Sequence, residues 1–254
     1  FLGAISIDSD SGTTSELADS PVVDWTGARG AQTEWVASAV QSNSANTQNP
    51  NLVFPSALIV DSNDNTIIVG SLVADITFGT VGASTQYQMG YIALANSQGV
   101  WQWVETLSGH SGGGFSGVTD ITQVGSDYYV CGWYQDNVTF GNQDRTSTSG
   151  SQDFFVSKIS SQGVFDWTTT GGGALTDTCE SITSASNGDV FAAGSFNTSA
   201  NFETISKASQ GGFDAWFGKV NTGQVVTSRW AWVTTAGGIM DDYGACIDTD
   251  GTSV

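Results

Sequence analysis

Short apolar runs separated by polar turns recur along the chain, and three pairs of such runs align with one another. They lie at residues 57–72, 119–134 and 181–196, and each pair flanks a turn made of Asn, Asp, Gly or Ser. Two apolar runs joined by a turn of this composition are typical of a β-hairpin. The pattern therefore predicts three hairpins of the same kind.

The hairpins are evenly spaced. Gly70, Gly132 and Gly194 follow one another at equal intervals, and Phe78, Phe140 and Phe202 keep the same interval. Self-similarity at a fixed period, here about 62 residues, is the sequence signature of a repeat architecture.

Each hairpin is followed by a third apolar segment and then by a fourth. The fourth segment carries two alternating aromatics, at Trp101/Trp103, Phe165/Trp167 and Trp230/Trp232. Alternate residues of a strand point to the same face, so we expect both aromatics of each pair on one face. One repeat is thus predicted to have four strands.

The two ends of the chain complete each other. A further hairpin begins at Gly244 and stops at Val254, before its second strand, and residues 1–6 have the pattern of that missing strand. The sequence therefore predicts one all-β, propeller-like domain whose four repeats close in phase across the termini. Its parts are 1–35, the second half of a repeat; 36–103, 104–167 and 168–232, the full repeats; and 233–254, the first half of a repeat. A polar insertion at 41–50 is expected to form a surface loop.

Two segments carry a family resemblance: Gly-Asp-Val-Phe-Ala-Ala-Gly at 188–194 and Gly-Phe-Asp-Ala-Trp-Phe-Gly-Lys-Val at 212–220, followed by tryptophan and paired glycines. Together they resemble the bacterial beta-propeller repeat family, strongly over 57–251 and weakly before Trp35. The resemblance implies four-stranded blades in a ring or an open array, on secreted or cell-surface proteins. It implies no particular activity, because propellers serve many functions.

Composition excludes several classes of partner. The chain has 254 residues and a formal net charge of −19, with only 6 Lys and Arg. A protein that follows nucleic-acid phosphates needs clustered Lys and Arg, so nucleic-acid binding is not expected. Anionic membranes are disfavoured for the same reason, and no apolar run approaches the ~18 residues of a membrane span. With 39% hydrophobic residues, the chain can still bury a core.

Acidic turns are the main candidates for a metal site. Asp61 and Asn63 in one turn, and Asp248 and Asp250 in another, have the alternating oxygen ligands of calcium-binding loops. The distal Glu of such a loop is missing, however, and Asn-Gly or Asp-Gly turns are also the usual hairpin connections. We therefore expect no metal or cofactor, with Ca²⁺ as the alternative.

The residues do not form a recognisable catalytic set. His110 is the only histidine and lies in a glycine-rich segment that we expect to be a loop, so neither a Ser/His/Asp device nor zinc catalysis is expected. Carboxylate pairs occur at Asp241-Asp242 and at Asp177 near Glu180, as glycoside hydrolysis requires. Acids also recur before each hairpin, at Asp120, Asp177 and Asp242, which favours a structural role.

Other residues suggest modification or packing. Asn137 and Asn197 begin N-glycosylation sequons and are expected at the surface. Cys131, Cys179 and Cys246 are interpreted as buried thiols, with a Cys131–Cys179 bridge as the alternative. The tryptophans that occur once per repeat indicate core packing, whereas Trp25 and Trp133 are buried, lie in an interface or stack on a sugar.

These patterns favour a non-enzymatic, extracellular structural protein that assembles head to tail by strand complementation. An unpaired strand edge invites another strand, from the same chain or from a copy. The residues assigned to this contact are Phe1, Leu2, Gly3, Ala4, Ile5, Cys246, Ile247 and Val254. The alternatives are a secreted propeller that binds glycan or another ligand on one face and, third, a glycoside hydrolase or lyase.

Overall fold

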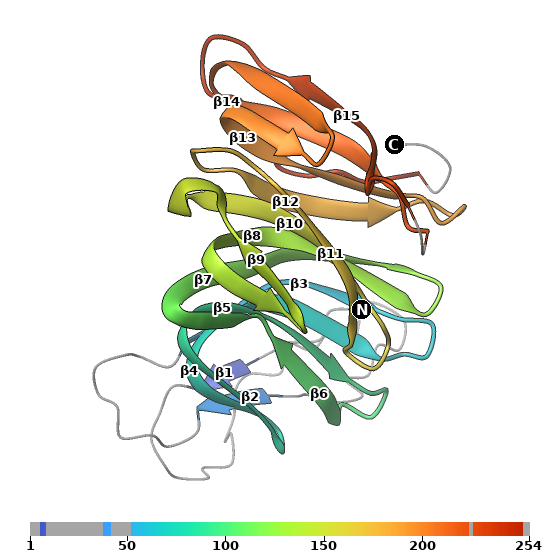
Figure 1. Ribbon diagram of the computed structural model, residues 1–254. Coiled ribbons are helices and arrows are strands. Elements are labelled where there is room, and N and C mark those ends of the chain that lie inside the picture. Colours follow the sequence, from blue (N-terminus) through green and yellow to red (C-terminus); the bar gives the residue numbers. More distant parts are fainter. Residues whose placement is uncertain (1–5, 9–37, 42–51, 224–225, 251–254) are drawn as a thin grey trace, which may run out of the picture.

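The computed structural model describes residues 6–8, 38–41, 52–223 and 226–250, and this part of the chain is all-β (Figure 1). Apart from one short parallel pair, its strands pair in the antiparallel direction, and one short 3₁₀ helix, η1 (Thr148–Gly150), lies between two strands of the same sheet. None of the helices in these ranges has the length and apolarity that a membrane crossing requires.

Three four-stranded antiparallel meanders follow one another in chain order (Figure 1). The first sheet contains β3 (Leu52–Val60), β4 (Thr66–Phe78), β5 (Val81–Ala95) and β6 (Trp101–Thr106). The second contains β7 (Ser108–Val124), β8 (Asp127–Phe140), β10 (Gln152–Ile159) and β11 (Phe165–Gly171), and β9 (Gln143–Thr146) pairs with the end of β8. The third contains β12 (Thr178–Ser184), β13 (Val190–Phe202), β14 (Ile205–Val220) and β15 (Trp230–Ala236).

The evenly spaced glycines have a common structural cause. Gly70, Gly132 and Gly194 each lie in the second strand of a sheet, opposite a register shift in the first strand. A Cβ at any of the three would lie 2.0 Å from a backbone carbonyl oxygen of that first strand. Only glycine permits this close approach of two backbones. The even spacing of these glycines therefore marks one β-bulge per sheet.

The predicted placement of the aromatic pairs is wrong. Phe165 lies in the core between the first and second sheets, whereas Trp167 lies in the core between the second and third. The pairing of β10 with β11 shifts by one residue at Asp166, and the same shift occurs at Gln102 in β6 and Ala231 in β15. A one-residue bulge reverses the alternation of a strand, so the two aromatics point to opposite faces.

Each sheet consequently has two apolar faces, which we call backward and forward according to the neighbour in chain order. The backward faces carry an aromatic cluster, which is Phe78, Tyr91 and Trp101 in the first sheet; Phe140, Phe155 and Phe165 in the second; and Phe202, Trp216 and Trp230 in the third. The forward faces of the first two sheets carry Ile67, Ile92 and Trp103, and Tyr129, Val156 and Trp167. Each of the two cores between sheets is a forward face covered by the backward face of the next sheet.

The chain ends depart from the sequence expectation where they are described. Residues 241–250 form no regular strand, although a strand was predicted from Gly244, because no described second strand lies beside them to pair with. β1 (Ser6–Asp8) pairs in parallel with β2 (Ser38–Gln41), which joins β4 of the first sheet. Residues 1–5 and 251–254, and most of the predicted insertion at 41–50, lie outside the described residues.

Candidate interaction surface

The forward face of the third sheet lacks the cover that the other two forward faces have. Phe191, Phe217 and Trp232 occupy the register positions that Tyr129, Val156 and Trp167 occupy in the second sheet. Trp167 is 8% exposed, whereas Trp232 is 42% exposed and Phe217 is 36% exposed. We call Phe191, Phe217 and Trp232 the open face, because no described sheet packs against them. Phe191 itself is only 9% exposed, since the Trp232 ring and the Lys219 ammonium of the same sheet lie against it.

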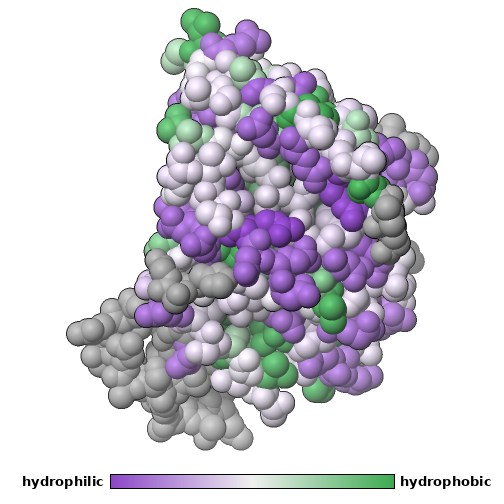
Figure 2. Space-filling model, viewed as in Figure 1, coloured by the Kyte–Doolittle hydropathy of each residue, from purple (hydrophilic) through white to green (hydrophobic). Residues whose placement is uncertain are grey.

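The connection that leaves the third sheet adds further exposed apolar side chains. Ile239 is 86% exposed, Met240 is 74% exposed and Tyr243 is 62% exposed. The Tyr243 ring packs on Phe213, with 5.2 Å between ring centroids. Figure 2 shows apolar side chains at the surface of the upper part of the molecule, where Figure 1 places the third sheet.

The C-terminal residues lie along β12 in the way that β12 itself lies along β7. Between the second and third sheets, the hydroxyls of Thr122 and Ser184 are 2.8 Å apart, 62 residues apart in sequence. Beyond the third sheet, the Thr183 hydroxyl donates to Asp248 at 3.4 Å and the Thr249 hydroxyl to the Ser184 carbonyl at 3.2 Å, each 65 residues apart. Residues 247–249 therefore lie beside β12, although they form no regular strand.

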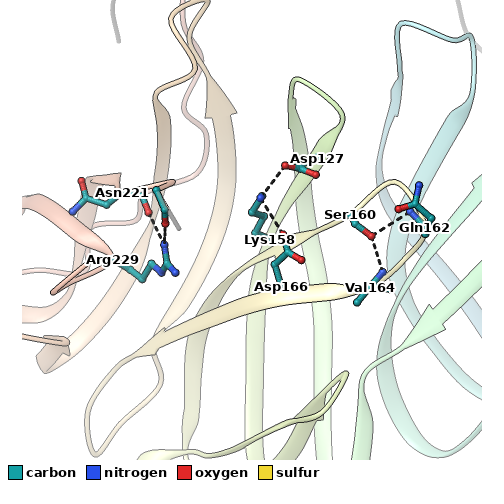
Figure 3. Close-up of polar contacts among 9 residues, drawn as sticks. Asp127, Lys158, Ser160, Gln162, Val164, Asp166, Asn221 and Arg229 are labelled. Carbon is teal, nitrogen blue, oxygen red and sulfur yellow. Dashed lines mark hydrogen bonds and ion pairs between the residues drawn. The ribbon is translucent and has the colours of Figure 1, made fainter. Parts of the chain in front are cut away.

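The lysines of the third strands hold their own sheets together. Lys158 in β10 is 5% exposed, and its Nζ lies 2.8 Å from Asp127 and 3.0 Å from Asp166 (Figure 3). Burial acts to lower the pKa of Lys158, but the two carboxylates outweigh it and hold that pKa above its usual value. Lys219 in β14 makes the equivalent contact with Asp189 at 2.6 Å. These ion pairs have a structural role.

A cation also covers the forward tryptophan of the second sheet. The Arg229 guanidinium lies over the Trp167 ring, 4.1 Å from its centroid. It is fixed there by donating to the carbonyls of Asn221 and Gly223 at 3.2 and 2.6 Å (Figure 3). The third sheet thus contributes both apolar cover and a cation–π contact to the second.

A buried acidic corner lies where the second sheet passes to the third. Asp153 and Asp177 are 3% and 0% exposed, and a Cβ on Gly172 would lie 2.5 Å from Asp153 Oδ1 and 2.9 Å from Asp177 Oδ2. Both carboxylate oxygens of Asp177 accept backbone N–H groups, from Gly173 and Asn197, whereas Asp153 Oδ1 has no partner. Burial raises the pKa of Asp153 to about 6 and that of Asp177 to about 7. Sequence reasoning did not find this pair, because it placed Asp177 with Glu180 and did not consider Asp153.

The predicted acidic turns serve the fold. Both carboxylate oxygens of Asp61 accept hydrogen bonds, from Asn63 and Asn65 within the turn and from the Tyr128 hydroxyl of the next sheet. Burial acts to raise the pKa of Asp61, but these hydrogen bonds outweigh it and hold that pKa below its usual value. Asp248 is exposed, as is Asp250. Within the described ranges, no three His, Cys, Asp or Glu side chains are grouped to hold a metal ion.

The other candidates have simpler positions. His110 lies within β7 and not in a loop, although residues 110–113 have no register partner in β8. Asp120 does not match Asp177 and Asp242, because it accepts hydrogen bonds from Ser181 and Ile182 of the next sheet.

Of the modification candidates, Asn137 is exposed and Asn197 half-buried. Trp133 is half-buried, and its indole lies against Gly117. Cys131 and Cys179 are buried thiols, whereas Cys246 is exposed and Ile247 half-buried. The remaining assembly residues, Phe1, Leu2, Gly3, Ala4, Ile5 and Val254, lie outside the described residues, as does Trp25.

Sequence reasoning missed the open face as a unit, because it assigned Trp232 to core packing. The signal was present, since Phe191 lies one repeat after Tyr129, in an apolar position that the next sheet would cover. Comparison with known protein families finds no family model that matches this chain, and comparison with curated proteins finds no match either.

Proposed function

We propose that this chain is a non-enzymatic structural protein of the cell exterior that self-associates head to tail through the open face. The observation that carries the proposal is the match between Phe191, Phe217 and Trp232 and the side chains that the first two sheets bury against their neighbours. A surface built like a core interface, but left uncovered, is typical of a protein–protein contact.

A second copy supplies the cover in this proposal. In this proposal residues 244–249, which lie beside β12, become the first strand of a fourth sheet on association, and residues 1–35 of the next copy supply its remaining strands, beginning with 1–6. An unpaired first strand gains main-chain hydrogen bonds when another strand is added beside it. The proposed complete unit is then a propeller-like array of four four-stranded repeats.

The position of the N-terminal strand supports a partner from another copy. Ser6–Asp8 pair with β2 in the first sheet, while residues 244–249 contact β12 in the third sheet. The two surfaces that would meet therefore differ and lie on different sheets of one molecule. A contact between two different surfaces is heterologous, and without ring closure it generates a filament.

The extracellular location is part of the same proposal. It is supported by the resemblance to a family of secreted and cell-surface proteins and by the net charge of −19, which keeps a surface protein soluble. The exposed Asn137 is a suitable acceptor if the chain meets a glycosylation machinery.

The test compares the sizes of purified variants over a range of concentrations, by sedimentation velocity and electron microscopy. We expect the wild type to form long assemblies, and the variants Trp232→Ser and Δ1–7 to need at least about tenfold higher concentration, as loss of a central aromatic contact implies. Val164→Ser is the matched control, because Val164 is 60% exposed on a turn away from the open face.

Two outcomes would overturn the proposal. A wild type that stays monomeric at all concentrations would show that the ring closes within one chain or that the open face has another ligand. Assemblies that are unaffected by Trp232→Ser and by Δ1–7 would show that they form through another surface. Loss of retention on a polysaccharide column by Trp232→Ser, with a monomeric wild type, would favour the glycan-binding alternative.

A further inference from the structure

Two cysteines from neighbouring sheets meet in the core between them. Cys131 lies in β8 of the second sheet and Cys179 in β12 of the third, and both are 0% exposed. The Cys131 side chain lies within hydrogen-bonding distance of the Cys179 thiol, and in the structure both are unbridged. Because the two residues belong to successive repeats, any bond between them would span two sheets.

One threonine shows how closely the two backbones approach. The Thr119 hydroxyl donates to the Cys179 carbonyl at 2.7 Å and lies 3.1 Å from the Cys131 carbonyl and 3.5 Å from Cys131 Sγ. A single short side chain thus reaches both cysteines. Cys131 and Cys179 both lie at β-bulges, where Gly132 and Gly194 let the first and second strands of each sheet approach closely. The backbone therefore holds the two cysteines in fixed positions.

We propose that Cys131 and Cys179 form a disulfide that joins the second and third sheets when the chain folds under oxidising conditions. The bond lies within one chain, so the proposal does not depend on self-association. Cys246 takes no part in this bond; it is exposed and remains a single free thiol.

The reaction is a thiol–disulfide exchange with a small-molecule or protein disulfide as oxidant. The thiolate of one cysteine attacks that disulfide, forms a mixed disulfide and releases one thiol; the second cysteine then attacks the mixed disulfide and releases the other thiol. The protein loses two electrons and two protons, and the oxidant is reduced to two thiols. The structure itself contains no oxidant.

Burial dictates when this exchange takes place. The thiolate is the attacking species, and burial together with the Cys131 side chain raises the pKa of the Cys179 thiol far above its ordinary value. The folded, reduced protein is therefore unreactive. The bond must form before the third sheet covers the second, and once formed it is protected from reductants.

The test refolds the full chain from denaturant with and without a mixture of oxidised and reduced glutathione, and counts thiols after renewed denaturation. We expect one reactive thiol after oxidative refolding and three after full reduction, with a peptide that links Cys131 to Cys179 identified by mass spectrometry. The oxidised form should melt roughly 5–10 °C higher, because the bond restricts the unfolded chain.

Matched variants keep the result interpretable. In Cys246→Ser, oxidative refolding should still remove the thiols of Cys131 and Cys179. In Cys131→Ser, the thiol of Cys179 should remain free. Three free thiols in oxidatively refolded wild type, or a linked peptide that contains Cys246, would overturn the proposal. If Cys131→Ser does not fold, the peptide map of the wild type alone decides between the outcomes.

Discussion

The acidic corner that follows the second sheet and the one that follows the third are built in the same way but end in different surroundings. At the first corner the Gly173 N–H donates to the Asp177 carboxylate, and the Asp177 N–H donates to the carbonyl of Gln152. At the second corner the Gly238 N–H donates to the Asp242 carboxylate, and the Asp242 N–H donates to the carbonyl of Phe213. The buried Asp153 and Asp214 lie beside them, each with an unpartnered Oδ1.

The difference between the corners lies in what covers them. Asp177 is fully buried because β12 and β13 pack over it, whereas Asp242 is exposed. The same difference separates Trp167, which is 8% exposed, from Trp232, which is 42% exposed. Local sequence therefore determines the shape of a corner, and the neighbouring sheet determines its burial. The following predictions use this pair of regions as an internal control.

The largest difference is expected for the two equivalent tryptophans. Trp167→Ala should destabilise the protein by about 3–5 kcal/mol, because it leaves a cavity in a closed core. Trp232→Ala should cost less than about 1 kcal/mol in a monomeric sample, since much of its side chain is already hydrated. Urea unfolding of both variants measures the two values. Equal losses would show that the open face is covered within the monomer.

A smaller difference is expected for the two equivalent glycines. A Cβ on Gly173 would lie 1.9 Å from the Ser199 carbonyl oxygen, whereas the nearest atom to a Cβ on Gly238 is Asp242 Oδ2 at 3.9 Å. Gly173→Ala should therefore cost about 2–3 kcal/mol, and Gly238→Ala should change stability by less than about 0.5 kcal/mol. Thermal unfolding distinguishes these outcomes. A destabilised Gly238→Ala would mean that the second corner is as crowded as the first.

A further difference concerns pH. The pKa values of Asp153 and Asp177 are raised to about 6 and about 7, so the folded state holds protons that the unfolded state releases near pH 4. Their contribution is therefore fully present below about pH 4 and is lost as pH rises through 6 and 7, at about 1.4 kcal/mol for each pH unit between the unfolded and folded pKa values of each carboxyl group. Unfolding curves at pH 4.5 and pH 8 measure this change.

A neutral variant sharpens the pH prediction. In Asp153→Asn, the amide oxygen can still accept from Thr148 N–H, and the amide nitrogen can donate towards Asp177. This variant should be more stable than the wild type at pH 8 and should depend less on pH. Asp214→Asn is the matched substitution at the second corner, where Asp242 is exposed. Equal effects of the two substitutions would show that burial of the first corner is not the cause of the change in stability with pH.

Sequence reasoning predicted the strands well and their faces poorly. The hairpins and the spacing of Gly70, Gly132 and Gly194 follow from local turn and backbone chemistry, which the sequence shows directly. The bulges at Gln102, Asp166 and Ala231 leave no comparable signal, because any residue can be the extra one. They reversed the predicted alternation. The fourth repeat and the closure across the termini stay predictions, because their strands lie mostly outside the described residues.

The candidate site was hidden for a related reason. Asp153 and Asp177 are distant in sequence, and their pairing depends on how the third sheet packs on the second. To predict the open face from the sequence, one must know that Trp232 points away from Trp230. The bulge at Ala231 causes this difference in direction. In both cases the chemistry arises from packing between sheets, and single-strand periodicity cannot show it. The repeated Gly-Gly with an Asp four residues after the second Gly was the available clue.

The order of the sheets also has a consequence for how this protein is made. A forward face is finished only when the backward aromatics of the next sheet arrive, one full repeat later in the chain. At ordinary rates of translation the ribosome needs roughly 3–12 s for that interval. During it the nascent chain displays a bare aromatic surface, which is what general chaperones recognise. For the first two sheets this state is brief, because the sheet that covers each of them follows directly in the chain.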